Sequence, residues 1–279
     1  MKKIFAVLFM FILTGLTLAE SRPDIDKLIE ELNDESWSVK VKSTLNLGKV
    51  KDSRAVEPLV NALNDENYYV RKYATNALVQ IGKPSFELLT ISLEDVNWRV
   101  RKSAAYALGE INDGSSARIL ANALKDENSY VVNEVKAALI KIGEPSIGSV
   151  IVLLGDENVD AQKSAGYVLS QIGNPAVKPL IGMLKNTNCY GVVEAIWALG
   201  EIGDRRAINS LLSMLKNKNN LIRWEAISAL GKIGDEKVIK FIKPMLKDED
   251  NHIKSIAKEV IEEFENGNKN KMSIAAFKN

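Results

Sequence analysis

The sequence predicts an all-α protein, an α-solenoid of stacked antiparallel helix pairs. The first observation is an internal repeat of 30 or 31 residues. The leading apolar residue of the repeat recurs at Val39, Val70, Val100, Val131, Ala161, Gly191, Ile222 and Ile253. The second observation is that each repeat holds two helical patterns, such as "VRKSAAYALGEI" followed by "ARILANALKD". Because one such pair is too small to bury its apolar stripe alone, neighbouring pairs must stack.

The repeats form seven full helix pairs between two half-repeats. Residues 23–34 supply a second helix ahead of the first pair, and residues 252–266 supply a first helix after the last pair. The final helix carries charged residues that can cover the end of the stack: Lys254, Lys258, Glu259, Glu262 and Glu263. We therefore expect a repeat domain over residues 20–266 and a loose tail over residues 267–279.

Two kinds of link join the helices within a pair. Three links read Gly-X-Pro, over residues 82–84, 143–145 and 173–175, and the others carry Asp52, Asp113, Asp204 or Asp235. A left-handed glycine is expected to end the first helix, and either proline or a capping aspartate to begin the second. The Asp link takes one residue more, which accounts for the repeat length of 30 or 31 residues.

These repeats resemble HEAT-like repeats of the phycobilisome-lyase type. The resemblance rests on "VRKSAAYALGEIND", "AISALGKIGD" and "RAVEPLVNAL", and it covers residues 23–266. It implies that the first helices line the concave face of the solenoid. It also implies that the basic residue after the leading apolar position pairs with a carboxylate of a turn, at Lys40, Arg71, Arg101, Arg223 and Lys254. Such repeats occur in chromophore lyases, in a metal-dependent hydroxylase and in binding scaffolds, so the fold alone does not assign a function.

The N-terminus has the pattern of a signal peptide. Lys2 and Lys3 precede an apolar run over residues 4–18, and Thr17-Leu18-Ala19 fits a cleavage site after Ala19. The run is shorter than the ~20 residues of a comfortable membrane span. We expect cleavage of residues 1–19 and export of the mature chain, secreted, periplasmic or at the cell surface. Retention of residues 1–19 as a membrane anchor is the alternative, and no other stretch is long and apolar enough to cross a membrane.

Charge and cysteine content narrow the function classes. The formal net charge is +1, which gives no excess of basic residues for nucleic-acid binding. Cys189 is the only cysteine, so an intramolecular disulfide is impossible and the fold must be stabilised by packing. We expect no nucleic-acid partner.

The residues that catalysis would need are scarce. His252 is the only histidine, so the His-Glu pairs through which the related hydroxylases bind iron are missing. A Ser-His-Asp or Cys-His nucleophile would also depend on His252. The acidic pairs at 34–35, 65–66, 126–127 and 156–157 recur at helix starts, where carboxylates cap backbone amides. We therefore expect no catalytic residue, no metal and no cofactor.

All tyrosines and tryptophans belong to the first helices or to the turns that precede them. Tyr106 lies about 145° from the apolar stripe of its helix, on the side that faces water in an isolated helix. Tyr167 and Trp197 share its place in the repeat, and Trp224 lies about one helical turn earlier. The candidate partner-binding residues are Lys72, Lys102, Tyr106, Lys163, Tyr167, Trp197 and Trp224. Trp37, Tyr68, Tyr69 and Trp98 are further candidates, although rings so close to a turn are also expected to cover the junction between repeats.

These observations predict a non-enzymatic exported scaffold. It would bind a protein or peptide partner in a concave groove that is lined by aromatic residues and basic towards its N-terminal half. The alternative is a chromophore-lyase-like or chaperone-like protein that acts on a bound protein subunit.

Overall fold

The computed structural model describes residues 24–186 and 189–266. The expected signal peptide (1–19) and C-terminal tail (267–279) lie outside these residues. The described part consists of helices joined by short turns and contains no strand, as the repeat pattern predicts. The chain divides into two compact units, one up to Leu88 and the other from Leu89 onward.

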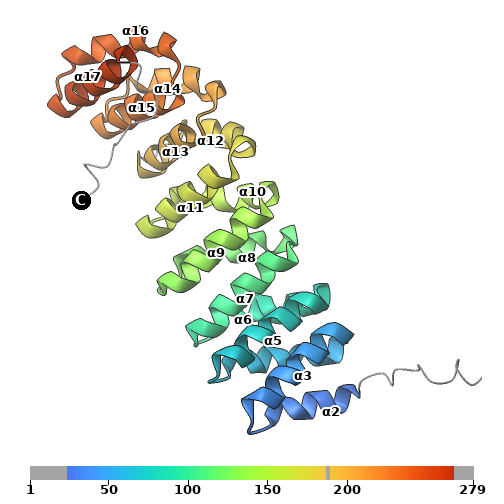
Figure 1. Ribbon diagram of the computed structural model, residues 1–279. Coiled ribbons are helices and arrows are strands. Elements are labelled where there is room, and N and C mark those ends of the chain that lie inside the picture. The colour runs from blue at the N-terminus through green and yellow to red at the C-terminus, as the bar shows by residue number, and fades with distance from the viewer. Residues whose placement is uncertain (1–23, 187–188, 267–279) are drawn as a thin grey trace, which may run out of the picture. The chain divides into compact units, whose positions relative to one another are not determined.

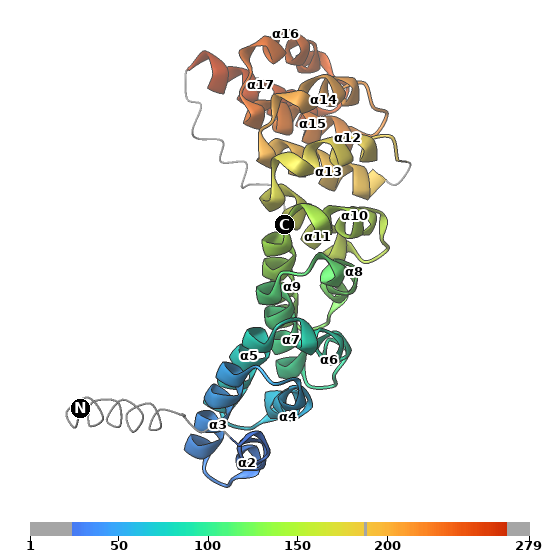
Figure 2. The same cartoon turned by 90° about the vertical axis from the view of Figure 1, so that its right-hand side faces the viewer.

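The first helices of the repeats are long and regular. Within the described residues they are α3 (Trp37–Val50), α5 (Tyr68–Ile81), α7 (Trp98–Ile111), α9 (Ser129–Ile142), α11 (Val159–Ile172), α13 (Cys189–Ile202), α15 (Asn220–Ile233) and α17 (Asn251–Glu265). Each begins two residues before the leading apolar residue of its repeat, so the register read from the sequence is confirmed. In the second unit, α7, α9, α11, α13 and α15 follow one another as neighbours (Figures 1 and 2).

The second helices are shorter. They are α2 (Ile25–Glu30), α4 (Val56–Asn61), α6 (Phe86–Ser92), α8 (Ala117–Asn122), α10 (Ile147–Val150), α12 (Val177–Met183), α14 (Ile208–Met214) and α16 (Ile239–Ile242). Their order along the chain confirms seven pairs between the half-repeats α2 and α17. The sequence predicts one continuous second helix per repeat, but 3₁₀ turns extend these segments, as at 53–55 and 62–64 around α4. Proline inside a segment, such as Pro58, removes a backbone N–H donor and favours this irregularity.

The two links differ in how the first helix ends. In the Asp links with Asp52 and Asp113, the residue that follows the first helix is left-handed, with φ/ψ of 59°/33° at Lys51 and 57°/40° at Asn112, but it is not the expected glycine. In the Gly-X-Pro links the expectation is wrong, because Gly82 has φ 76° and ψ −130°, a conformation open essentially to glycine alone. Gly82 both ends α5 and begins the next 3₁₀ turn, where Ser85 N donates to its carbonyl at 2.8 Å. Gly82 therefore occupies both cap positions, whereas the Asp link uses two residues for them. This difference explains the shorter repeat.

In each of the seven full pairs, a leucine eight positions after the leading residue lies in the centre of the core. In the second unit these are Leu108, Leu139, Leu169, Leu199 and Leu230, and each is at most 1% exposed. Hydrophobic burial at one repeated position therefore holds the repeats together.

Glycines set the closest approaches between neighbouring first helices. A Cβ atom added to Gly109 of α7 would lie 2.7 Å from Cβ of Ala138 on α9. Gly200 of α13 meets Ala229 of α15 in the same way, at 2.9 Å. The backbones of these helix pairs approach so closely that a methyl group does not fit between them. Glycine at this position is therefore a packing requirement.

Gly148 in α10 provides the opposite case. A Cβ atom there would have no neighbour within 4 Å, and α10 is only 4 residues long. We expect Gly148→Ala to raise the free energy of unfolding by about 0.5–1 kcal/mol and to slow amide hydrogen exchange around residues 145–160. Gly109→Ala should lower the free energy of unfolding by about 1–3 kcal/mol through overpacking. Urea denaturation of both variants checks the prediction, which two shifts of the same sign would contradict.

No single helix in the described part of the chain has both the length and the hydropathy of a membrane span. Two consecutive helical segments, Ser129–Ile142 and Glu144–Gly155, reach this length and hydropathy when they are taken together. They are bent by 117° where they meet.

Candidate protein-binding surface

The turns between repeats place the aromatic rings at the starts of the first helices. Asp126 accepts a hydrogen bond from Asn128 N at 2.8 Å, and Asn128 in turn accepts one from Tyr130 N at 3.0 Å. The turn before Tyr69 repeats this arrangement. The interpretation of the acidic pairs as structural is confirmed here, although the residue that caps the helix is the asparagine two positions after the aspartate.

The basic residue that follows the leading apolar position forms ion pairs with the next repeat. Arg101 makes a bidentate ion pair with Asp126 of the next repeat, with N–O distances of 2.6 and 2.9 Å, and also donates to the carbonyl of Asp95 at 2.8 Å. Two further pairs join Lys40 to Asp65 and Arg223 to Asp248, both at 2.8 Å. The pairing with turn carboxylates is thus confirmed at these three positions.

Part of the basic charge expected in the N-terminal half is used within the turns. Arg71 donates to the carbonyls of Asp65 and Glu66, at 2.7 and 2.8 Å. Together with Lys40 and Arg101, it directs its charge into the turns and not towards a partner. Lys72, by contrast, has an exposed side chain.

The aspartates in these pairs have lowered pKa values. Burial acts to raise the pKa of Asp126, but hydrogen bonds from Arg101 and from Asn128 N outweigh it and hold the pKa below its usual range. The hydrogen bond from Arg223 does the same to the pKa of Asp248. Both carboxylates therefore stabilise the folded chain in their charged form.

A pH dependence follows from these pKa values. A carboxylate whose pKa is lower in the folded than in the unfolded state stabilises the fold at about pH 5 and above, and this contribution is lost as the pH falls through the folded pKa. We expect the free energy of unfolding to fall on acidification from about pH 6 to pH 3. The double variant Asp126→Asn/Asp248→Asn should start lower and fall less. Urea titrations across this range measure the difference, and parallel curves for the two proteins would contradict it.

The predicted residues on the first-helix face of the second unit differ in exposure. The outward position of the two tyrosines is confirmed, since Tyr106 is 39% and Tyr167 is 43% exposed. Trp197 and Trp224 are half-buried, and Lys163 is exposed. Lys102 is half-buried and its Nζ lies 3.8 Å from Glu134, while Lys136 Nζ lies 5.4 Å from the centre of the Tyr167 ring.

Three of the four predicted rings at the helix starts are more exposed than Tyr106 and Tyr167. Trp37 is 51%, Tyr68 60% and Tyr69 52% exposed, whereas Trp98 is half-buried. Trp37 stacks on Tyr69 of the next repeat, with ring centres 5.8 Å apart. Such stacking partly covers the junctions, as expected, but leaves about half of each ring in water.

The sequence interpretation missed two residues of this kind. Tyr130 and Tyr190 are both 62% exposed, and Tyr130 stacks on Trp98 with ring centres 5.4 Å apart. Their place in the repeat, one residue before the leading apolar position, is the same as that of Tyr69. This shared offset was the signal that could have identified them.

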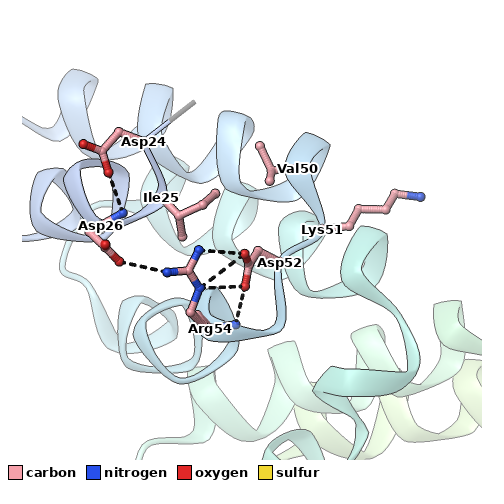
Figure 3. A pocket seen from close by; sticks show the side chains of 7 residues that line it. All are labelled: Asp24, Ile25, Asp26, Val50, Lys51, Asp52 and Arg54. Atoms are coloured by element: carbon pink, nitrogen blue, oxygen red, sulfur yellow. Dashed lines mark hydrogen bonds and ion pairs between the residues drawn. The ribbon is translucent and has the colours of Figure 1, made fainter. Parts of the chain in front are cut away.

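A polar hollow of about 600 Å³ lies in the first unit beside α2 and the link that follows α3. It is lined by Asp24, Ile25, Asp26, Val50, Lys51, Asp52 and Arg54 (Figure 3). Arg54 pairs with Asp52 at 2.9 Å and with Asp26 at 3.2 Å, while Asp24 caps α2. The carboxylates that line this hollow therefore pair with Arg54 or cap a helix. Among the described residues, no group of three or more His, Cys, Asp or Glu side chains could hold a metal ion.

Several solved structures are similar to this chain. Human deoxyhypusine hydroxylase, in complex with glycerol, is 18% identical over 87% of this chain and 96% of its own, with a TM-score of 0.39. The CpcE–CpcF complex of phycocyanin lyase from Nostoc sp. PCC7120 is 21% identical over 88% and 97%, with a TM-score of 0.38. Kap95p, from a complex with RanGDP, is 14% identical over 86% of this chain and 40% of its own, with a TM-score of 0.51. At 14% identity, the likeness to Kap95p concerns the fold alone.

The match to a family model identifies the family of the chain. No curated protein matches the chain significantly. The family model for HEAT repeats matches residues 25–95, 86–152 and 177–262, which together cover most of the chain. The matched residues lie within the helical repeats described above. The chain belongs to the HEAT-repeat family.

Proposed function

We propose that the chain is a non-enzymatic exported scaffold that binds a protein or peptide partner through the aromatic side chains of its first helices. The observation that carries this proposal is the exposure of Tyr106 and Tyr167 on the first-helix face. A ring of this size removes about 150–250 Å² from water when it is buried. Leaving such rings exposed at the same place in different repeats forgoes that stabilisation, which makes sense if a partner covers them.

The surrounding residues suit protein recognition. Lys163 adds an exposed charge to the same first helix as Tyr167, and the half-buried Trp197 and Trp224 extend the aromatic surface over α13 and α15. Interfaces are enriched in aromatic anchors with polar residues around them. Kap95p, whose fold is similar, is seen bound to Ran, which supports protein binding as a use of such a surface. We further propose that Lys72 and Lys102 flank the binding surface in their respective units, and that the face is concave.

Photo-crosslinking tests the proposal. A photoreactive phenylalanine analogue at Tyr167 should capture a discrete protein in the native host. The same analogue at Lys178, an exposed residue of the second helix α12, serves as the matched control. Capture that is equal at both positions, or absent at Tyr167, would contradict the proposal. Bilin transfer by the purified chain would instead favour a lyase-like function.

Export is part of the proposal and has its own test. Because residues 1–19 have the pattern of a signal peptide, the mature chain is expected to begin at Glu20 and to lie outside the cytoplasmic membrane. N-terminal sequencing of the protein purified from its host measures this directly. An intact Met1 on cytosolic protein would contradict export.

A further inference from the structure

We infer that the second helix of the last pair docks on an anionic lipid surface. The docking segment comprises residues 237–247, which form α16 and parts of the 3₁₀ turns on either side of it. It lies at the C-terminal end of the second unit, beside α17 (Figures 1 and 2). This inference goes beyond the proposed function, because it concerns the second helices and does not depend on the binding of a protein partner.

The docking segment carries four exposed lysines and no acidic residue. The lysines are Lys237, Lys240, Lys243 and Lys247. They are three or four residues apart, so they occupy neighbouring positions on the surface of the helical segment. None of the four forms an ion pair with a described residue. Their charge is therefore available to a ligand.

Carboxylates that flank the docking segment are used elsewhere. Asp235 lies 3.9 Å from Nε of Arg205, which belongs to the preceding repeat. Arg223 pairs with Asp248 at 2.8 Å and lies 3.9 Å from Glu249. These contacts leave the positive charge of the docking segment uncompensated.

The last lysine of the docking segment belongs to a row of lysines in the last three pairs. Lys185 and Lys216 hold the place of Lys247 at the ends of α12 and α14, and both are exposed. Earlier second helices of the same unit have Glu94 and Lys125 at this place, and Lys125 forms an ion pair with the next repeat. The basic surface is therefore confined to the C-terminal second helices.

Apolar side chains stand exposed among these lysines. Phe241 is 44% and Leu246 is 41% exposed, whereas Leu184 and Leu215, at the place of Leu246 in the two preceding pairs, are 8% and 5% exposed. Among the described residues no second helix follows α16, which leaves this side of Leu246 uncovered. Nζ of Lys240 lies 4.9 Å from the centre of the Phe241 ring, so charge and apolar surface lie side by side.

Charge decides what covers this surface. The C-terminal tail, residues 267–279, contains Lys269, Lys271 and Lys278 and no acidic residue, so it would bring like charges together. Two copies of the docking segment would repel each other for the same reason. An anionic partner is complementary to the segment and relieves the repulsion between its lysines.

Phe241 and Leu246 distinguish a bilayer from other anionic partners. At a membrane surface, lysines contact the lipid phosphates while apolar side chains enter the boundary between headgroups and acyl chains. A soluble acidic polymer offers charge but no such apolar layer. The combination of exposed lysines with an exposed phenylalanine and leucine therefore matches an anionic lipid surface.

Sedimentation with lipid vesicles tests the inference on the chain as its host processes it. Phosphatidylcholine vesicles with about 30% phosphatidylglycerol should bind the chain at least about tenfold more tightly than pure phosphatidylcholine vesicles. The difference should shrink between about 0.05 M and 0.5 M NaCl, because salt screens the lysines. Equal binding to both kinds of vesicle at low salt, or no binding to either, would overturn the inference.

Lysine variants locate the binding. Lys240→Gln/Lys243→Gln should weaken binding to the phosphatidylglycerol vesicles at least about tenfold, since each lysine near such a surface contributes a factor of about five. Lys42→Gln/Lys49→Gln removes two exposed lysines of α3 and changes the net charge equally, so it is the matched control. It should weaken binding less than about threefold. Equal losses in the two variants would show a response to net charge alone and overturn the docking segment.

An apolar variant separates a bilayer from a soluble polyanion. Phe241→Ser/Leu246→Ser should weaken vesicle binding at least about fivefold and leave the binding of polyphosphate unchanged. Circular dichroism checks that the variant is folded, and every variant has the same N-terminus as the unmodified chain. Unchanged vesicle binding in the folded variant would show that the segment recognises anionic polymers in general, and it would overturn the assignment to lipid.

Discussion

Leu199→Ala is expected to lower the free energy of unfolding by about 2–5 kcal/mol. Leu199 on α13 is fully buried and belongs to the leucine position that repeats along the core. Truncation to alanine removes apolar burial and leaves a cavity that the neighbouring repeats fill only in part. Urea or thermal denaturation, followed by circular dichroism, measures the change.

The control for this prediction lies on the exposed face. Tyr106→Ala/Tyr167→Ala removes two large rings that are 39% and 43% exposed, and should lower the free energy of unfolding by about 1 kcal/mol or less. A loss as large as that of Leu199→Ala would show that these tyrosines support the fold.

Arg101→Ala is expected to destabilise the chain by about 3 kcal/mol. Its guanidinium is 11% exposed and holds the Asp126 carboxylate, which is 8% exposed, while it also donates to the carbonyls of Asp95 and Val96. Its removal leaves the buried Asp126 carboxylate without its counter-ion, and the two carbonyls lose the guanidinium donor. Arg101→Lys should restore the stability only in part, because lysine cannot form the bidentate pair.

An exposed arginine provides the comparison. Arg54 also pairs with aspartates, but its side chain is 58% exposed, so Arg54→Ala should change the stability far less than Arg101→Ala. Equal losses of unfolding free energy in the two variants would contradict the conclusion that the buried Arg101–Asp126 pair stabilises the contact between repeats three and four.

Much of the fold could be predicted from the sequence because the repeat fixes the register. The start of every first helix in the described chain, the seven pairs and the outward position of Tyr106 follow from the period and from the angle around one helix. The conformation of Gly82 did not follow, because the residue count of a link says nothing about ψ. The close approach of Gly109 to Ala138 depends on packing between repeats, which a single helical pattern does not describe.

The candidate surface was predicted less completely. The sequence places Lys40, Arg71 and Arg101 on the first helices, yet their direction depends on where the next turn lies in space. Similarly, the exposure of Tyr130 depends on how much of its ring the neighbouring Trp98 covers. Both are properties of the stack, and neither belongs to one repeat alone.

The affinity of Tyr106→Ala/Tyr167→Ala for the partner captured at Tyr167 tests the central claim most directly. The account predicts loss of binding by about 100-fold or more, as expected for aromatic anchors, with a free energy of unfolding close to that of the unmodified chain. Unchanged affinity in a folded variant would contradict the claim that these exposed rings serve recognition.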